Sequence, residues 1–239
     1  MLMADKKYKT IAIIPARGGS KRIPNKNLKE FLGIPILQMI LKKTKECMIF
    51  DEIMVSTDSE QIKKLSLDNG ANVPFMRSSK NADDLAPLQN VIFEVLEFYQ
   101  SQNISFEYFC CILPTAALLK KQNLQKAYDL LDQNNDLDGI MPVCEYSNPI
   151  LRSYTIENNL LKINSPENYL KRSQDLPPAY YDAGQFYFYR TKSFLKQKTF
   201  MTKNTYPLFL KEIESQDIDT IDDWNLAEMK HKINFKDYE

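Results

Sequence analysis

The sequence predicts an α/β fold organised around a doubly wound, mostly parallel sheet. Three observations support this prediction: short apolar runs alternate with amphipathic segments, the first run opens into a Gly-Gly turn, and 239 residues suit one large domain. Short runs that are apolar throughout are typical of strands buried on both faces. Their alternation with helices is typical of parallel sheets. We therefore interpret residues 1–239 as a single domain.

The first strand is predicted over Thr10–Ile14, where Pro15 ends the apolar run. The first helix follows a Gly33-Ile34-Pro35 turn, because apolar side chains recur at helical spacing from Ile36 to about Glu46. These elements form the first strand–helix unit of the predicted sheet.

The second strand, Glu52–Thr57, leads into a helix that Asp58 or Ser59 can cap and that ends near Asn69-Gly70. A third strand is predicted over Asn72–Met76, followed by a polar loop to Ala86 and a helix that starts at Pro87. The remaining predicted elements are strands at 106–113, 138–143 and 186–189 and a helix at 121–133. In such sheets ligands bind beyond the carboxyl ends of the strands, so we expect the site in the loops after Ile14, Val55, Met76 and Leu113.

The regular alternation is interrupted after Val143. Leu151–Ile156 and Leu160–Ile163 predict a hairpin around Glu157-Asn158-Asn159, and a polar, proline-containing stretch follows up to residue 182. A hairpin too small to fold alone often docks on a partner subunit. The alternative is that it packs on its own sheet.

The loop after the first strand is rich in cations and glycine. It contains Arg17, Gly18, Gly19, Ser20, Lys21, Arg22, Lys26 and Asn27. The glycines let backbone N–H groups approach oxygens, and the cations neutralise negative charge. The order of these residues is neither that of a P-loop nor that of the G-x-G-x-x-G fingerprint. The loop therefore predicts a polyphosphate site of another kind; the alternative is a solvated basic loop without a ligand.

Composition limits the partners. The 31 basic and 31 acidic residues balance, which argues against a nucleic-acid or membrane-surface partner. The four cysteines lack C-x-x-C spacing, and Cys110 and Cys111 lie in an apolar run. We expect reduced core thiols and a cytoplasmic protein. The single histidine, His231, is expected on an exposed helix face and excludes multi-histidine metal sites.

The stretch P-A-R-G-G-S-K-R-I-P-x-K-N resembles the N-terminal signature of the nonulosonic-acid cytidylyltransferases, and later motifs extend the resemblance over most of the chain. The resemblance implies a Rossmann-type fold like that of nucleotide-diphospho-sugar transferases. It also implies CTP and a nonulosonic acid sugar as substrates, and a CMP-sugar and pyrophosphate as products. It further identifies residues 145–175 as a dimerisation insertion, hence a homodimer.

The resemblance assigns the nucleotide to the basic loop and to the loop after the third predicted strand. The implied nucleotide-binding residues are Ala16, Arg17, Gly19, Ser20, Lys21, Asn27, Arg77, Asp84 and Ala86. Arg17 and Lys26, with Asp219, are the implied catalytic residues. For Asp83 and Asp84 the alternative is that they cap the helix near Pro87.

The stretch S-Q-D-I-D-T-I-D-D contains Asp217 and Asp219 one residue apart, so in an extended chain both carboxylates lie on one face. Two carboxylates facing a triphosphate loop suit Mg²⁺, which completes its coordination with phosphate oxygens and water. The stretch also resembles the family's metal motif. The alternative is that Asp219 and Thr220 only cap the next helix.

The sugar side differs from the sialic-acid enzymes of the family. Their Q-P-T-S-P-L-R pattern is replaced here by L-P-T-A-A-L-L, beginning at Leu113. Y-D-A-G-Q-F-Y, at Tyr181–Tyr187, resembles the pseudaminate branch. The predicted sugar-binding residues are Leu113, Arg152, Arg172, Tyr181, Asp182 and Gln185; for Arg152 and Arg172 the alternative is ordinary surface charge. A sialic or legionaminic acid substrate, or a non-catalytic nucleotide-sugar module, remains an alternative.

Overall fold

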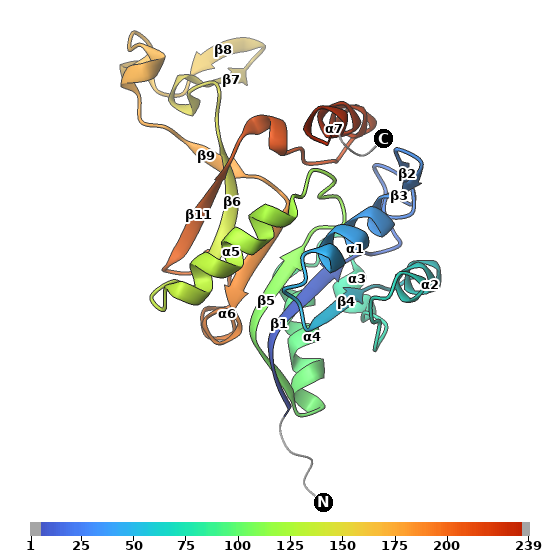
Figure 1. Ribbon diagram of the computed structural model, residues 1–239. Coiled ribbons are helices and arrows are strands. Elements are labelled where there is room, and N and C mark those ends of the chain that lie inside the picture. The colour runs from blue at the N-terminus through green and yellow to red at the C-terminus, as the bar shows by residue number, and fades with distance from the viewer. Residues whose placement is uncertain (1–5, 236–239) are drawn as a thin grey trace, which may run out of the picture.

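The computed structural model describes residues 6–235, and its centre is a seven-stranded sheet (Figure 1). The strand order is β11-β6-β10-β5-β1-β4, with β9 paired to β6. Only β9 and β10 run against the others, which confirms the mostly parallel sheet. The strands are β1 (Lys6–Pro15), β4 (Glu52–Ser56), β5 (Ile104–Ile112), β6 (Gly139–Glu145), β9 (Tyr180–Asp182), β10 (Phe186–Arg190) and β11 (Thr205–Leu210).

Helices cover both faces of this sheet. Successive side chains of β1 point to opposite faces, and those of Ile11–Ile14 are all apolar and buried, so both faces need a covering layer. Ala12 and Ile14 belong to one apolar cluster with side chains of α1 and α5, whereas Ile11 and Ile13 belong to another with α4 and α6. The helices are α1 (Ile36–Glu46), α2 (Glu60–Asp68), α3 (Ser79–Ala82), α4 (Leu88–Ser101), α5 (Lys121–Gln133), α6 (Thr191–Gln197) and α7 (Ile221–Asn234). The doubly wound arrangement is therefore confirmed, because one layer of helices packs on each face of the same strands.

Some predicted elements differ from the structure. The strand predicted over Asn72–Met76 is wrong: only an isolated bridge joins Asn72 to Met54, and β4 is the last strand on this side of the sheet. The loop from Arg77 to Ala86 contains the short helix α3, and β11 and α6 were not predicted. His231 is half-buried rather than exposed, because its ring stacks on Phe235 and packs edge-on against Phe31.

The segment after β6 projects from the body of the molecule (Figure 1). It carries a hairpin of β7 (Tyr154–Glu157) and β8 (Leu160–Ile163), whose turn residues Asn158 and Asn159 both have positive φ. Short 3-10 turns flank it at Ile150–Arg152, Pro166–Asn168 and Ser173–Asp175. The hairpin makes its own two-stranded sheet and is not paired with the central one.

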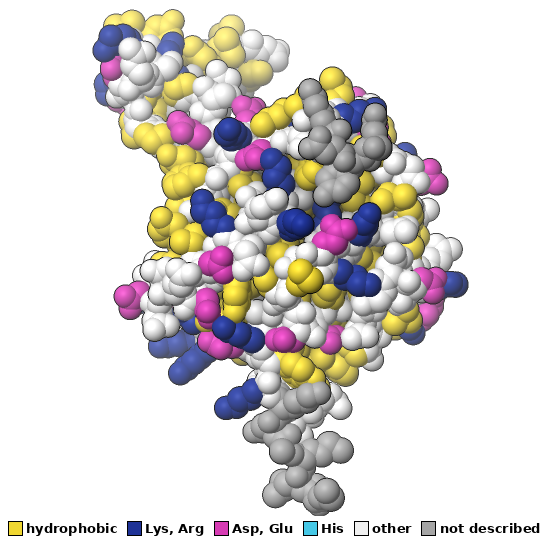
Figure 2. Space-filling model, viewed as in Figure 1, with side chains coloured by type: hydrophobic (Ala, Val, Ile, Leu, Met, Phe, Trp, Pro, Cys, Tyr) yellow, Lys and Arg dark blue, Asp and Glu magenta, His cyan; other side chains and the backbone are white. Residues whose placement is uncertain are grey.

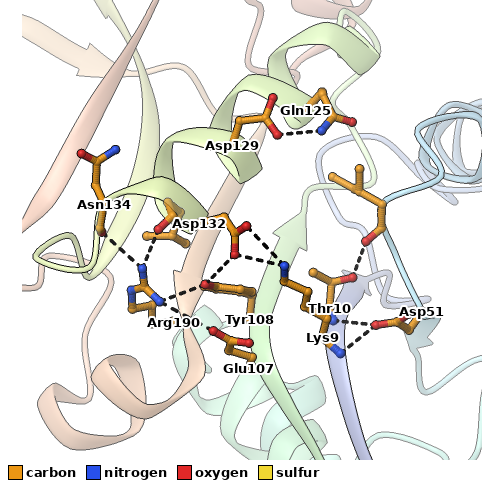
Figure 3. Close-up of polar contacts among 12 residues, drawn as sticks. Lys9, Thr10, Asp51, Glu107, Tyr108, Gln125, Asp129, Asp132, Asn134 and Arg190 are labelled. Carbon is orange, nitrogen blue, oxygen red and sulfur yellow. Dashed lines mark hydrogen bonds and ion pairs between the residues drawn. The ribbon is translucent and has the colours of Figure 1, made fainter.

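The sheet end opposite the predicted site is fixed by a polar network (Figure 3). Arg190 donates to the carbonyl oxygens of Leu131 and Leu137 and to the Tyr108 hydroxyl, at 2.5, 3.0 and 2.9 Å. Asp132 on α5 accepts from Tyr108 and from Lys9 on β1. These bonds join α5 to β1, β5 and β10. The loops of the predicted site lie at the other end of the sheet.

Two smaller features complete the fold. β2 (Glu30–Phe31) and β3 (Ile34–Pro35) form a two-stranded ribbon between the basic loop and α1, and a 3-10 turn at Glu212–Glu214 precedes α7. Within residues 6–235, no helix is both long and apolar enough to cross a membrane.

Candidate active site

The basic loop begins where β1 ends and is anchored to the end of β4. Ala16 N–H donates to the Ser56 carbonyl at 2.9 Å, and Gly18 N–H donates to Asp58 Oδ1 at 2.8 Å. A Cβ added at Gly18 would lie 3.0 Å from the Ser59 Cβ, so glycine permits this close approach. The buried Asn27 donates to the Arg17 carbonyl at 2.8 Å and closes the loop on itself.

This loop forms a cavity of about 160 Å³ together with the chain that follows β5. The cavity is lined by Pro15, Arg17, Ser20, Lys21, Arg22, Ile23, Lys26, Asn27, Leu113, Pro114 and Thr115. The structure thus brings Leu113, predicted to face the sugar, next to the cations predicted to hold phosphates. Gly19 lies exposed on the same loop, and Ala16 is fully buried beneath it.

Two carboxylates pair with the four cations of the loop and offset two of their four positive charges. Asp84 pairs with Arg17 and, at 2.5 Å, with the Lys21 ammonium. These contacts, the Lys21 hydrogen bond first, lower the pKa of Asp84. The carboxylate of Asp219 lies 2.7 Å from Arg22 Nη1 and 3.7 Å from Lys26 Nζ. Asp84 therefore does not cap α4, whose N-cap, Pro87, has no side-chain cap.

Lys26 connects the basic loop to the D-I-D segment. Its ammonium donates to the Ile218 carbonyl at 2.6 Å, and 18% of its side chain is exposed. Burial lowers the pKa of Lys26, an effect that the charges of Asp219 and Asp217 oppose. A largely desolvated cation beside two carboxylates acts more strongly on nearby charge than a solvated one.

Asp217 and Asp219 form a carboxylate pair opposite the basic loop. Partial desolvation, and then the charge of Asp219, raises the pKa of Asp217. A Cβ added to Gly184 would lie 3.7 Å from the Asp217 Cβ, so the loop after β9 approaches the pair. Thr220, not Asp219, is the N-cap of α7, in a capping box with Asp223. The alternative role of Asp219 as a cap is thus not observed.

The carboxylate pair fits Mg²⁺ in its donor chemistry. Within the described part of the chain, no group of three or more His, Cys, Asp or Glu side chains could hold a metal ion. Mg²⁺ usually takes one or two protein carboxylates and completes its shell with phosphate oxygens and water. Desolvation and the charge of Asp219 raise the pKa of Asp217, and a bound cation would favour the ionised form of both carboxylates.

The Tyr181–Gln185 segment lies beside the carboxylate pair. Asp182 accepts from the Gly184 N–H at 2.8 Å and from the Tyr187 hydroxyl at 2.6 Å. The buried Gln185 donates to the Glu214 carbonyl at 2.5 Å. Tyr181 is half-buried against Tyr146. Gly184, between Asp182 and Gln185, is the residue of this segment that comes close to Asp217.

Other predicted site residues do not line the cavity. Arg77 is buried and donates to the Ser56 hydroxyl and carbonyl, and desolvation lowers its pKa to about 10. Ala86 is half-buried in the loop before α4. On the projecting segment, Arg152 is half-buried and contacts Ser173, and Arg172 is exposed and pairs with Asp175. Their contacts with substrate stay predictions.

Sequence reasoning missed two contributors to the site. Asp58 was interpreted only as a helix cap, but it holds the Gly18 N–H. Arg22 belongs to the basic loop but was given no role, and it pairs with Asp219. The position of Asp58 directly after a strand that ends at the same sheet edge was the available signal.

The comparisons with known proteins agree with this geometry. A family model described as cytidylyltransferase matches residues 11–230. This chain belongs to the cytidylyltransferase family. It is 38% identical over 227 residues to the pseudaminic acid cytidylyltransferase of Campylobacter jejuni, covering 95% of this chain and 97% of that one. The family resemblance identified in the sequence is thereby confirmed.

One further relative and one solved structure extend the comparison of this cytidylyltransferase. The CMP-N,N'-diacetyllegionaminic acid synthase of Legionella pneumophila is 31% identical over 232 residues, covering 94% of this chain and 97% of that one. The structure of CMP:2-keto-3-deoxy-manno-octonic acid synthetase complexed with CTP superposes with a TM-score of 0.68 at 15% identity, covering 96% of this chain and all of that one. This superposition confirms the fold.

Proposed function

We propose that this cytidylyltransferase transfers CMP from CTP to the anomeric hydroxyl of pseudaminic acid and releases pyrophosphate. The observation that carries the proposal is the cavity in which Arg17, Lys21 and Lys26 meet Leu113, opposite the Asp217–Asp219 pair. A cationic wall suits a triphosphate and an apolar wall suits a sugar with a deoxygenated end. The similarity to the Campylobacter jejuni enzyme over nearly all of both chains supports the same substrate.

The reaction needs positioning and charge neutralisation more than covalent catalysis. The anomeric oxygen attacks the α-phosphorus in line, the bond to the β-phosphate oxygen breaks, and pyrophosphate carries away the negative charge. Arg17 and Lys21, which pair with Asp84 in the absence of substrate, would bind phosphate oxygens in its place. Lys26, already desolvated, would stabilise charge that grows on the α-phosphate and the leaving pyrophosphate.

Asp217 and Asp219 would hold Mg²⁺, which when bound neutralises phosphate charge and aligns the reacting groups. Asp219 also pairs with Arg22 and Lys26, and both cations would turn to the triphosphate when it binds. In this proposal Asp84 and Asp219 therefore offset two of the loop's four positive charges until the triphosphate binds.

The choice of sugar gives a direct test. A hydroxylated glycerol tail against Leu113 would bury hydroxyls without partners, at about 1–3 kcal/mol each, and one such penalty corresponds to roughly tenfold. We expect kcat/KM for pseudaminate at least tenfold above that for N-acetylneuraminate in a pyrophosphate-release assay. Leu113→Gln should narrow this ratio. Equal or better turnover of N-acetylneuraminate, or of a legionaminic acid, would overturn the sugar assignment and leave the CTP chemistry in place.

We also propose a homodimer formed through the projecting segment 145–175. Apolar side chains gather there on the surface (Figure 2). Those that are exposed are Tyr146, Ile150, Tyr154, Ile156, Leu160, Leu161, Tyr169 and Leu170. A solvent-exposed group of this kind is unusual for a monomer and favours an interface. The register places Ile156 opposite Leu161 across the hairpin.

Light scattering at micromolar concentration should give the mass of two chains for the wild type. Leu161→Glu, at a side chain that is 73% exposed, should shift the mass towards one chain because a charge would be buried in the interface. Met48→Glu is the matched control, since Met48 is 89% exposed on the end of α1 and should leave the mass unchanged. A wild-type mass of one chain would contradict the proposal.

A cytoplasmic location is proposed as well. The four cysteines are free and buried, which suits a reducing compartment. The thiols of Cys110 and Cys111 are raised in pKa by complete burial, so they are poor nucleophiles.

A further inference from the structure

A small apolar core lies under the candidate site, separate from the two clusters that pack against the central sheet. Its buried members are Ile23, Phe31, Ile36, Met39, Ala117, Ile218, Trp224 and Ala227. Three of these come from different loops of the site: Ile23 from the basic loop, Ala117 from the chain after β5, and Ile218 from the D-I-D segment. We refer to this cluster as the α7 core, because Trp224 and Ala227 of α7 belong to it.

Ile218 has the most direct connection to the reacting groups. It is fully buried, whereas Asp217 before it is exposed and Asp219 after it is half-exposed. Along an extended chain, neighbouring side chains point to opposite sides. Holding the Ile218 side chain in the α7 core therefore turns both carboxylates outward, to the same side.

The Ile218 backbone is held from the other direction. Lys26 donates to its carbonyl at 2.6 Å, and the Asp219 N–H donates to Asp223 at 3.1 Å. The same Asp223 completes the capping box at Thr220, which fixes the start of α7. The residue between the two carboxylates is thus fixed through its side chain, its carbonyl and the following N–H.

The wall against which Ile218 packs is itself rigid. Trp224 is 2% exposed and its ring meets Phe31 edge-on at 5.5 Å between centroids. Phe31 belongs to the β2–β3 ribbon that directly follows the basic loop. A shift of Ile218 would therefore change the distance between the carboxylate pair and Lys26, while the sheet beneath would not need to move.

We propose that Ile218 is a positioning residue of the transfer reaction: its burial in the α7 core sets the Asp217–Asp219 pair relative to Lys26. The proposal rests on the proposed function, in which this pair holds a divalent cation. Misplacement of reacting groups by about 1 Å can cost roughly 10²-fold in rate, so a buried apolar residue that touches no substrate can control turnover.

The test compares Ile218→Ala with Ile92→Ala. Ile92 is also fully buried, but it lies on α4 in the cluster on the far side of the sheet, so the same atoms are removed away from the site. Mn²⁺ affinity, measured by electron paramagnetic resonance of the free ion, is read beside kcat and KM for CTP. Ile218→Ala should weaken Mn²⁺ binding about tenfold and lower kcat by roughly 30- to 100-fold, with KM for CTP within about threefold.

Ile92→Ala should lower the melting temperature comparably but change Mn²⁺ affinity and kcat by less than about threefold. If Ile218→Ala does not fold, Ile218→Val and Ile92→Val replace the pair, with a smaller difference of the same sign. Equal effects at the two positions would overturn the positioning role alone. A wild type that turns over no CTP with any nonulosonic acid and binds no Mn²⁺ would overturn the proposed function and the role of Ile218 with it.

Discussion

Lys26→Ala is expected to lower kcat by roughly 10²-fold or more, as removal of a preorganised charge stabiliser does. The ammonium is largely desolvated and is held on the Ile218 carbonyl before any ligand arrives. It therefore needs little reorganisation when negative charge moves from the α-phosphate to pyrophosphate. The affinity for CTP should change less, because Arg17, Lys21 and Arg22 share the ground-state triphosphate.

Lys21→Ala is the matched control for this prediction. Lys21 lies on the same loop, but 84% of its side chain is exposed, so its contribution is screened by solvent. Its loss should raise KM for CTP a few-fold and leave kcat nearly unchanged. Steady-state kinetics with a saturating sugar separate the two effects. If Lys26→Ala instead loses CTP affinity and keeps kcat at saturation, Lys26 is only a docking residue.

The parts of the site that sequence predicted are those encoded locally. Lys26 and the other cations follow one strand within a few residues, and alternation alone places Asp217 and Asp219 on one face. Parallel strands then bring the loops after β1 and β5 to one edge, which is why Leu113 meets the basic loop in the same cavity. Local chemistry and sheet topology were sufficient for these predictions.

The pairing of charges could not be predicted in the same way. Asp84 and Asp219 are far in sequence from the cations they contact, and a carboxylate near a helix start is equally consistent with capping. The contact of Arg77 with Ser56 was also not predicted, and its contact with the triphosphate stays a prediction. Such choices between competing partners depend on the three-dimensional positions of side chains.

Errors in the fold have a similar origin. Asn72–Met76 has an apolar character that suits a strand, but only Asn72 reaches β4, at a single bridge. The reversed direction of β10 leaves no mark on periodicity, because its Phe186–Tyr189 run is as apolar as that of a parallel strand. Strand identity was predictable at β10 and strand direction was not.

Asp217→Asn is expected to abolish most turnover while leaving the folded protein as stable as the wild type or more so. Partial desolvation and the charge of Asp219 raise the pKa of Asp217, so in the absence of a cation the ionised carboxylate destabilises the folded state. The penalty is present above the raised pKa and disappears as the pH falls below the unfolded value, about 4. Asparagine keeps the shape of the side chain and removes its charge. A substitution that raises stability and lowers activity is common at active sites, where function requires a destabilising group.

Thermal unfolding in EDTA at pH 7 and near pH 3.5, beside pyrophosphate-release assays with and without Mg²⁺, tests this expectation. The melting temperature of Asp217→Asn should equal or exceed that of the wild type at pH 7, and the difference should shrink at the lower pH. Asp223→Asn is the control in which the melting temperature should fall. Hydrogen bonds from Thr220 lower the pKa of Asp223, so its ionised carboxylate stabilises the start of α7, and removing that charge should destabilise the helix. Wild-type turnover that persists in EDTA, or an Asp217→Asn variant of normal kcat, would remove the metal role from this carboxylate pair.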